Sequence, residues 1–236
     1  MIRGVVLAGG SGSRLAPLTR TINKHLLPVG RQPMIYYPVK ALVSAGVTDI
    51  LVVTGVEHIG DIVSQLRSGE EHGCRFTYRV QERPLGIADA LSLAEDFARG
   101  EPVVVVLGDN IFDAPLAPHL AAFTASGAAA QIHLHRVATP RRFGCARFDG
   151  TRLVEIIEKP QDPPSDLAVT GIYIFDAQVY GFITALTPSQ RGELEISDIN
   201  NRYLALGKLR HVELTGYWTD AGTHASLQHA NRLVSE

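Results

Sequence analysis

Cysteine, net charge and long apolar runs are all scarce in this sequence of 236 residues. The two cysteines, Cys74 and Cys145, lack the spacing of a Cys/His metal site and indicate reduced structural thiols. The 22 basic and 24 acidic residues give a net charge of −2, which provides no broad surface for nucleic acid or anionic membranes. The longest apolar stretches, such as residues 103–107, are far shorter than the ~18 residues that span a membrane. We therefore expect a cytoplasmic protein that binds neither nucleic acid nor membrane.

Two common phosphate-binding motifs are absent as well. A dinucleotide-binding fingerprint that begins at Gly10 and Gly12 would require glycine or alanine at position 15, where the chain has Leu15. A Walker loop requires serine or threonine after a Gly-Lys pair, but Gly207 and Lys208 are followed by leucine. These absences argue against a nicotinamide-dependent oxidoreductase and against a P-loop enzyme.

Short apolar runs alternate with helical patterns in the first half of the chain, which predicts an α/β fold with a mostly parallel sheet. In the second half the strand-like pieces lie closer together, and Asp149 with Gly150 marks a hairpin. The expected strands are 2–7, 49–54, 76–80, 103–107, 130–135, 145–148, 153–158, 169–175 and 209–214. The expected helices are 34–45, 59–67, 87–97, 177–186, 197–206 and 223–234.

The strongest local signal is a glycine-rich segment after the first expected strand, Leu7-Ala8-Gly9-Gly10-Ser11-Gly12. Glycines let a backbone approach a ligand closely, and successive N–H groups can form an anion-binding nest. Arg14 adds a permanent charge with bidentate geometry for phosphate. The segment therefore predicts a phosphate-binding loop, with a plain flexible turn as the alternative.

Three charged residues farther along the chain would suit such a loop. Lys24 precedes an apolar run and is a second candidate phosphate ligand, although a lone lysine is more often a surface residue. Asp109 follows an expected strand, at the end where open α/β sheets bind ligands, and a carboxylate beside phosphate suits Mg²⁺; an Asp-Asn turn is the alternative. Asp220 precedes the final expected helix, so it is either a second metal ligand or the N-cap of that helix.

Two further segments place polar groups at the ends of expected strands. Gln81 lies before Gly86 in a loop, and a glutamine amide can both donate to and accept from the edge of a base. Glu158 and Lys159 place an acid and a base side by side, with a surface ion pair as the alternative.

Taken together, these motifs resemble the sugar-1-phosphate nucleotidyltransferase family, and within it the glucose-1-phosphate thymidylyltransferases. The resemblance rests on Gly-Gly-x-Gly-Ser-Arg-Leu-x-Pro-Leu-Thr at 9–19, Asn-Lys-His-Leu-Leu-Pro-Val at 23–29 and Trp-Thr-Asp-Ala-Gly-Thr-His at 218–224. It extends from residue 2 to about residue 231 with the motifs in the family's order. It implies a Rossmann-like three-layer α/β/α fold with a mixed, mostly parallel central sheet. The single domain, 1–236, would have a nucleotide-binding part at about 1–110 and a sugar-binding part at about 111–236.

The resemblance also implies roles for the residues that match its motifs. The catalytic cations would be Arg14, Lys24, Lys159 and Arg191. The nucleotide would be bound by Leu7, Ala8, Gly9, Gly10, Ser11, Gly12, Gln81, Gly86 and Asp109. The sugar would be bound by Asn110, Gly144, Glu158, Lys159 and Val169. The cofactor, Mg²⁺, would be held by Asp109 and Asp220.

The implied reaction is Mg²⁺-dependent transfer of a thymidylyl group from dTTP to α-D-glucose 1-phosphate by direct in-line attack. Its products would be dTDP-glucose and pyrophosphate. Alternatives are the same chemistry with UTP, CTP or another sugar 1-phosphate and, more remotely, a non-catalytic nucleotide-sugar binding module. The resemblance further implies a homo-oligomer, either a dimer or a tetramer.

Three positions depart from the family's pattern. Phe143 stands where tyrosine is usual, His25 where glutamine is common, and Leu85 where a polar residue is often found. These departures concern the choice of sugar and base and leave the metal and phosphate residues unchanged. The sequence ends just after the last matching motif, which predicts a short form without the family's C-terminal regulatory helices and with weak or no feedback inhibition by a dTDP-sugar.

Overall fold

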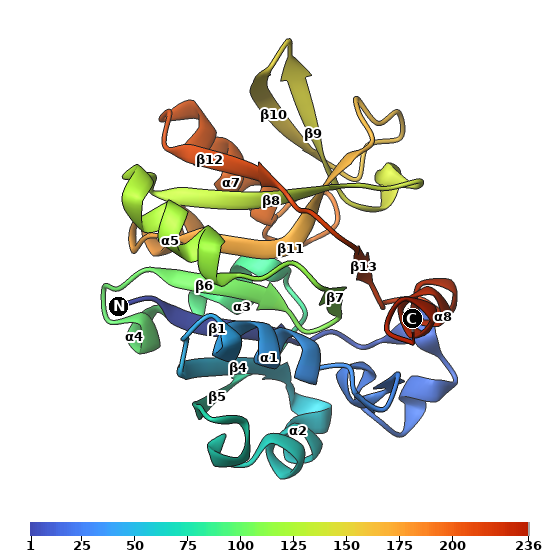
Figure 1. Ribbon diagram of the computed structural model, residues 1–236. Helices are drawn as coiled ribbons and strands as arrows, with labels where there is room; N and C mark the ends of the chain where they lie inside the picture. Colours follow the sequence, from blue (N-terminus) through green and yellow to red (C-terminus); the bar gives the residue numbers. More distant parts are fainter. Residues whose placement is uncertain (236) are drawn as a thin grey trace.

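The computed structural model describes residues 1–235 and is built around one large mixed β-sheet with helices on both faces (Figure 1). The strands of this sheet are β1 (Arg3–Ala8), β4 (Asp49–Gly55), β5 (Arg75–Gln81), β6 (Val103–Leu107), β8 (Ala130–Arg136), β9 (Gly144–Asp149), β10 (Arg152–Glu158), β11 (Leu167–Phe175) and β12 (Leu209–Glu213). Two short ladders pair β2 (Pro28–Val29) with β3 (Gln32–Pro33) and β7 (Asn110–Phe112) with β13 (Trp218–Asp220). The helices are α1 (Tyr36–Ser44), α2 (Ile59–Leu66), α3 (Ile87–Ser92), α4 (Glu95–Ala98), α5 (Ala117–Ser126), α6 (Gln178–Thr184), α7 (Ile196–Ala205) and α8 (His224–Leu233).

Strands β6, β1, β4 and β5 lie side by side and run parallel, so their carboxyl ends meet at one edge of the sheet. Successive side chains of a strand point to opposite faces. In β1, Val5 and Leu7 belong to the core that includes α3, α6 and α7, whereas Val6 and Ala8 belong to the core that includes α1, α2 and α5. This alternation gives the sheet two apolar faces and produces the three layers expected from the sequence.

The second half of the chain extends the same sheet through β11, which pairs antiparallel with β6, β8 and β9. Beyond β9 lies β10, joined to it by the hairpin expected at Asp149 and Gly150. The pairing of β11 with β8 shifts its register between Val169 and Tyr173. Such irregularities are common next to binding sites, and Gly171 in this stretch lines a cavity.

Most expected elements are found, and the differences have local causes. The helix expected at 87–97 is divided into α3 and α4, because the Ala94 N–H donates to the Leu91 carbonyl oxygen three residues earlier and tightens the turn. Helix α5 and the short strands β7 and β13 were not among the expected elements.

The C-terminal segment returns to the first half of the chain. Strand β13 pairs with β7 so that Asp220 lies opposite Asn110. Helix α8 then packs beside the segment that follows β1, where the Gly30 N–H donates to Asn231 Oδ1 at 2.9 Å (Figure 1). The N-cap of α8 is Thr223, which forms a capping box with Ser226. Asp220 is therefore not the cap of this helix, and its carboxylate is available for another role.

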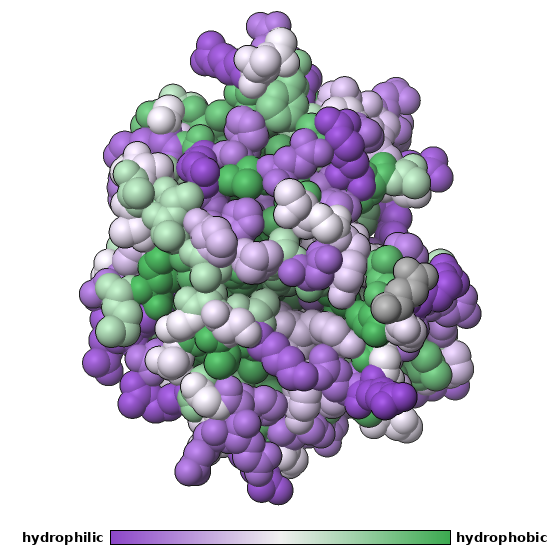
Figure 2. Space-filling model, viewed as in Figure 1, coloured by the Kyte–Doolittle hydropathy of each residue, from purple (hydrophilic) through white to green (hydrophobic). Residues whose placement is uncertain are grey.

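We next consider membrane-spanning helices and the polarity of the surface. Within residues 1–235, no helix has both the length and the apolar character needed to cross a membrane. On the face drawn in Figure 2, hydrophilic side chains alternate with small hydrophobic patches.

His133 on β8 is a buried histidine that makes folding sensitive to acid. Its ring nitrogens lie 3.0 Å from the Ile172 carbonyl oxygen and 3.0 Å from Gln131 Nε2. Burial lowers the pKa of His133 to about 3, with smaller contributions from His119 and Arg210. The unfolded chain, with a pKa near 6.5, therefore binds more protons than the folded chain between these two values, and stability falls as the pH falls through this window.

We expect His133→Asn to lower stability at pH 7 but to lose less stability than the wild type on acidification. The wild-type chain should lose about 2 kcal/mol through this group between pH 7 and pH 5, at 1.36 kcal/mol for each unit of pKa shift. Urea unfolding at the two pH values measures the difference, and the exposed His229→Asn should behave like the wild type. Equal acid sensitivity of the wild type and His133→Asn would contradict this account.

Candidate active site

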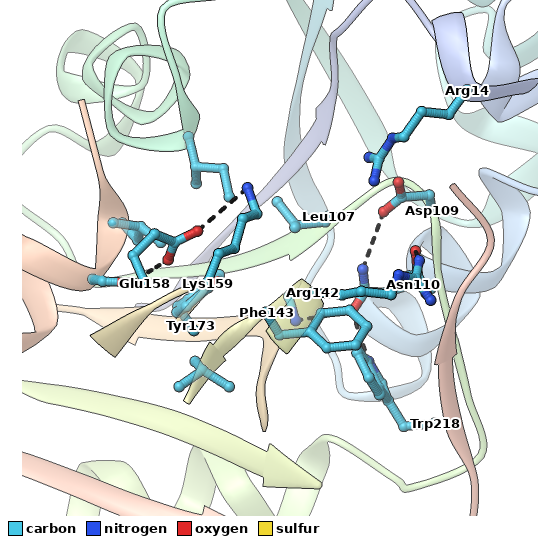
Figure 3. A pocket seen from close by; sticks show the side chains of 17 residues that line it. Arg14, Leu107, Asp109, Asn110, Arg142, Phe143, Glu158, Lys159, Tyr173 and Trp218 are labelled. Atoms are coloured by element: carbon cyan, nitrogen blue, oxygen red, sulfur yellow. Dashed lines mark hydrogen bonds and ion pairs between the residues drawn. The ribbon is translucent and has the colours of Figure 1, made fainter. Parts of the chain in front are cut away.

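A cavity of about 170 Å³ opens where the carboxyl ends of β1 and β6 face the strands of the second half. Figure 3 shows Arg14 and Asp109 on one side of this cavity and Glu158 and Lys159 on the other. The other predicted residues in its walls are Asn110, Gly144, Val169 and Asp220. The structure thus brings together acidic and basic groups from both halves of the chain.

The glycine-rich segment begins where β1 ends. Gly10 and Gly12 have φ angles of 93° and 62°, a region that glycine adopts without steric cost. Leu7 and Ala8 are buried, so only their backbones can face a ligand. A methyl group on Gly12 would lie 3.2 Å from Lys24 Cβ, which shows how closely the loop packs against the segment that carries the second predicted cation.

Lys24 lies inside the site and not on the surface. Its Nζ is 2.7 Å from Asp109 Oδ2, and both side chains are less than 15% exposed, at 14% and 13%. Burial alone would raise the pKa of the Asp109 carboxyl, but the Lys24 ammonium, together with His25 and hydrogen bonds from Lys24 and Asn110, holds it well below its usual range. Asp109 is therefore ionised at neutral pH and is able to hold a cation.

Asp220 is the second carboxylate of the site. Its Oδ2 accepts a hydrogen bond from Arg142 Nη2 at 2.7 Å. Burial raises the pKa of Asp220, the neighbouring Asp109 carboxylate raises it further, and Arg142 opposes both effects. Because the two carboxylates repel each other, a cation between them would be stabilised by both.

Whether Asp109 and Asp220 suit a metal ion depends on the space between their carboxylates. A methyl group on Gly222 would lie 3.2 Å from Asp220 Oδ2, 3.3 Å from Asp109 Oδ2 and 3.6 Å from Arg14 Nη2. In the part of the chain that is described, no group of three or more histidine, cysteine, aspartate or glutamate side chains gathers as a metal site. Two carboxylates with room for phosphate oxygens are the ligand set that Mg²⁺ takes in phosphate chemistry, so these residues fit that ion.

Asn110 joins three parts of the site. Its Oδ1 accepts hydrogen bonds from the Gly171 N–H at 2.9 Å and from Trp218 Nε1 at 2.7 Å. Its Nδ2 donates to Asp109 Oδ1 at 3.1 Å. With 1% of its surface exposed, Asn110 holds Asp109 in place, and its predicted contact with the sugar stays a prediction.

On the opposite wall, Glu158 is at the end of β10 and accepts a hydrogen bond from Ser197 Oγ. Lys159 follows with φ 41°, an unusual conformation for a residue with a side chain, and its Nζ lies 3.4 Å from Glu158 Oε1. Strained backbone of this kind is concentrated at functional sites. Gly144 lies beside this pair, since a methyl group there would be 3.4 Å from Glu158 Oε2.

Arg191 and Gln81 lie outside the main cavity. Arg191 contacts Glu158 Oε1 at 3.4 Å, and its guanidinium also pairs with Glu193 and Glu195. Gln81 lines a second cavity, together with Gly10 and Ser11 of the glycine-rich segment. The glycine-rich segment thus lines the Gln81 cavity through Gly10 and Ser11, and it packs through Gly12 against Lys24, which pairs with Asp109.

Two residues of the site were missed by sequence reasoning. Arg142 lines the cavity and pairs with Asp220, and Gly222 keeps open the space between the carboxylates. The Arg141-Arg142 doublet before Gly144 was a signal for the first of them, because basic residues beside a predicted sugar phosphate site are candidate ligands.

The three residues that depart from the family's pattern lie in different surroundings. His25 is buried behind Gly108, and burial, with a contribution from Lys24, lowers its pKa to about 3. Phe143 packs edge-to-face against Trp218, with ring centroids 5.3 Å apart. Leu85 fixes its loop through its backbone, since its carbonyl oxygen accepts from the N–H of Leu194 at 2.7 Å. Within residues 1–235, none of the three side chains forms a hydrogen bond or ion pair with Asp109, Asp220 or Lys24.

Comparisons with known proteins identify the family of this chain. Residues 3–236 match the family model described as nucleotidyl transferase. The chain is 45% identical to a glucose-1-phosphate thymidylyltransferase of Neisseria meningitidis, covering 99% of this chain and 82% of that relative. It is 40% identical to the enzyme of the same name from Mycolicibacterium smegmatis, again over 99% of this chain and 82% of the relative.

Solved structures show the same fold. A crystal structure from Bacillus anthracis, assigned as a glucose-1-phosphate thymidylyltransferase and complexed with sucrose, has a TM-score of 0.96 and 52% identity, covering 100% of this chain and 96% of that one. A UDP-glucose pyrophosphorylase has a TM-score of 0.87 at 23% identity and supports the fold alone, over 100% of this chain and 98% of that one. Since the family model covers nearly the whole chain and close relatives share this name, the chain belongs to the nucleotidyl transferase family and is an enzyme of sugar-1-phosphate nucleotidyl transfer.

Proposed function

We propose that this enzyme transfers a thymidylyl group from dTTP to α-D-glucose 1-phosphate and releases pyrophosphate. In this reaction an oxygen of the sugar phosphate attacks the α-phosphorus of dTTP, and the bond to the pyrophosphate oxygen breaks. The atoms balance without a covalent enzyme intermediate. Catalysis then consists of positioning the two phosphates and neutralising their charge.

The donor nucleotide would lie along the glycine-rich segment. The backbone of residues 9–12 would face its phosphates, because Gly10 and Gly12 place N–H groups there without side chains in the way. Arg14 and Lys24 would neutralise the triphosphate and the departing pyrophosphate. Gln81 and Gly86 would bind the base in the second cavity, which Gln81 lines.

Asp109 and Asp220 would hold Mg²⁺, a role supported by their ionisable oxygens on either side of the Gly222 position. When bound, this ion supplies charge neutralisation on the phosphate oxygens. In this structure Lys24 forms an ion pair with Asp109, and Arg142 forms one with Asp220. Both Oδ2 atoms lie within 3.3 Å of the position that a methyl group on Gly222 would take.

The acceptor would lie between the two walls of the main cavity. Glu158 is an acceptor for sugar hydroxyls, and Ser197 and Arg191 hold its carboxylate. Lys159 would contact the sugar phosphate, and Arg191 would support that phosphate from the rim. Gly144 and Val169 would complete the sugar pocket.

The observation that carries the proposal is the placement of Asp109 and Asp220, with Arg14 beside them, opposite Glu158 and Lys159 in one cavity. A pyrophosphate-release assay with a panel of nucleotides and sugar 1-phosphates tests it. We expect dTTP with glucose 1-phosphate to give the highest kcat/KM and to yield dTDP-glucose. A higher kcat/KM with UTP or CTP, or with another sugar 1-phosphate, would replace this pair of substrates within the same chemistry.

A further inference from the structure

The side chain of Gln81, at the end of β5, is held in one orientation. It is buried, with 8% of its surface exposed. Its Nε2 donates to Asp89 Oδ2 at 2.7 Å and to the Gly86 carbonyl oxygen at 3.2 Å. A carboxylate and a carbonyl oxygen can only accept hydrogen bonds, so the amide nitrogen has to face them. Rotating the amide by half a turn would place its oxygen against the Asp89 carboxylate.

The opposite end of the same amide faces the nucleotide side. A methyl group on Gly9 would lie 3.1 Å from Gln81 Oε1, so this oxygen points toward the glycine-rich segment. Gln81 lines the cavity that also includes Gly10 and Ser11. Of the Gln81 amide, it is therefore the oxygen, a hydrogen-bond acceptor, that faces this cavity.

Asp89 departs from the usual behaviour of an acidic residue at its position. It is the third residue of α3, where a carboxylate commonly accepts from N–H groups at the start of its own helix. Here the carboxylate accepts from the Gln81 amide instead. Asp89 lines neither the Gln81 cavity nor the main cavity, so its effect on a ligand would pass through Gln81.

We propose that Asp89 is a positioning residue that determines base specificity. By fixing the Gln81 amide with its oxygen toward the cavity, it selects a base that carries an N3–H, thymine or uracil, and rejects cytosine. The N3–H of thymine or uracil donates to this oxygen, whereas N3 of cytosine is itself an acceptor and would face Oε1 without a proton between them. The inference rests on the proposed function because it takes the Gln81 cavity as the base site.

Binding of dUTP and dCTP to the full chain, measured by calorimetry with Mg²⁺ and without sugar phosphate, tests this role. These two nucleotides differ only at the edge of the base, so the ratio of their Kd values measures the preference for uracil over cytosine. We expect the wild type to bind dUTP at least ~10-fold more tightly than dCTP, as a mismatched buried acceptor implies. In Asp89→Asn the new amide can donate to Gln81 Oε1 and allow it to turn, so the ratio should fall to within about 3-fold.

The matched control is Asp96→Asn, which removes an exposed carboxylate from the next helix and should keep the wild-type ratio. Asp89→Ser serves as a second variant, and circular dichroism melting establishes that each variant is folded. A merely structural role for Asp89 would weaken both nucleotides equally, and an unchanged ratio in both variants would overturn the proposal. So would equal affinity of the wild type for dUTP and dCTP.

The outcome is separable from that of the proposed function. If the enzyme selects dUTP over dCTP through Asp89 but does not turn over dTTP with glucose 1-phosphate, the reaction assignment fails and the role of Asp89 stands. If it does turn over that pair but the ratio of the dUTP and dCTP Kd values is the same in the Asp89 variants as in the wild type, the role of Asp89 fails and the reaction assignment stands.

Discussion

Replacing Asp109 with asparagine should lower kcat by about 100- to 1,000-fold, comparable with the loss of one electrostatic contribution to transition-state stabilisation, because the variant would hold Mg²⁺ less well. The amide keeps the size of the side chain but loses the negative charge that pairs with Lys24 Nζ at 2.7 Å. It also loses the charge that would hold Mg²⁺ together with Asp220. Pyrophosphate release at saturating substrates, followed over a range of Mg²⁺ concentrations, measures the effect.

The control for this variant is Asp149→Asn, at the exposed turn between β9 and β10, which should retain wild-type turnover. Thermal unfolding separates a loss of chemistry from a loss of fold. Full activity in Asp109→Asn would remove this carboxylate from the metal site and leave the motif at 107–112 with a structural role only.

Replacing Gly222 with alanine should weaken binding of a divalent cation at least ~10-fold and reduce turnover accordingly. The added methyl group would lie 3.2 Å and 3.3 Å from the nearest oxygens of Asp220 and Asp109, in the space that a cation between them needs. No charged group is removed, so the effect comes from occupied space alone. Replacement by valine should abolish binding, because its branches extend farther into that space.

Binding of Mn²⁺ in place of Mg²⁺, followed by electron paramagnetic resonance, measures this effect without turnover. Gly60→Ala is the matched control, since a methyl group there meets no atom within 4 Å and alanine favours the helix α2. Undiminished Mn²⁺ affinity in Gly222→Ala would show that the cation lies elsewhere.

Residues with strong local patterns made much of the fold predictable. Strands covered on both faces read as uninterrupted β-branched runs, as Val103 to Val106 do in β6. Helix α5 gave no such pattern, because alanines surround Leu120 and Phe123 and its apolar face is weak. Strands β7 and β13 have three residues each and exist only through pairing across about a hundred positions, which no local window reveals.

The same difference between local and long-range signals applies to the residues of the site. The glycine-rich segment and Asp109 were candidates because each follows an expected strand, and Lys24 was a candidate because it lies in a compact motif downstream of the glycine-rich segment. The sequence left Asp220 between a metal ligand and a helix cap, and only the capping box of Thr223 with Ser226 decides against the cap. The pair of Arg142 with Asp220 joins positions 78 residues apart, so no spacing rule could show it.

The ladder of β13 on β7 also affects when activity can appear during synthesis. Asp220 takes its place beside Asn110 only through this ladder, so it joins the site well after Asn110 has been synthesised. At roughly 5 to 20 residues per second, a ribosome needs roughly 5 to 20 s to synthesise the stretch from Asn110 to Asp220. If the proposed function is right, a nascent chain that has folded β1, β4 and β6 has the glycine-rich segment and Asp109 for several seconds before Asp220 arrives, and it does not consume nucleotide during that time.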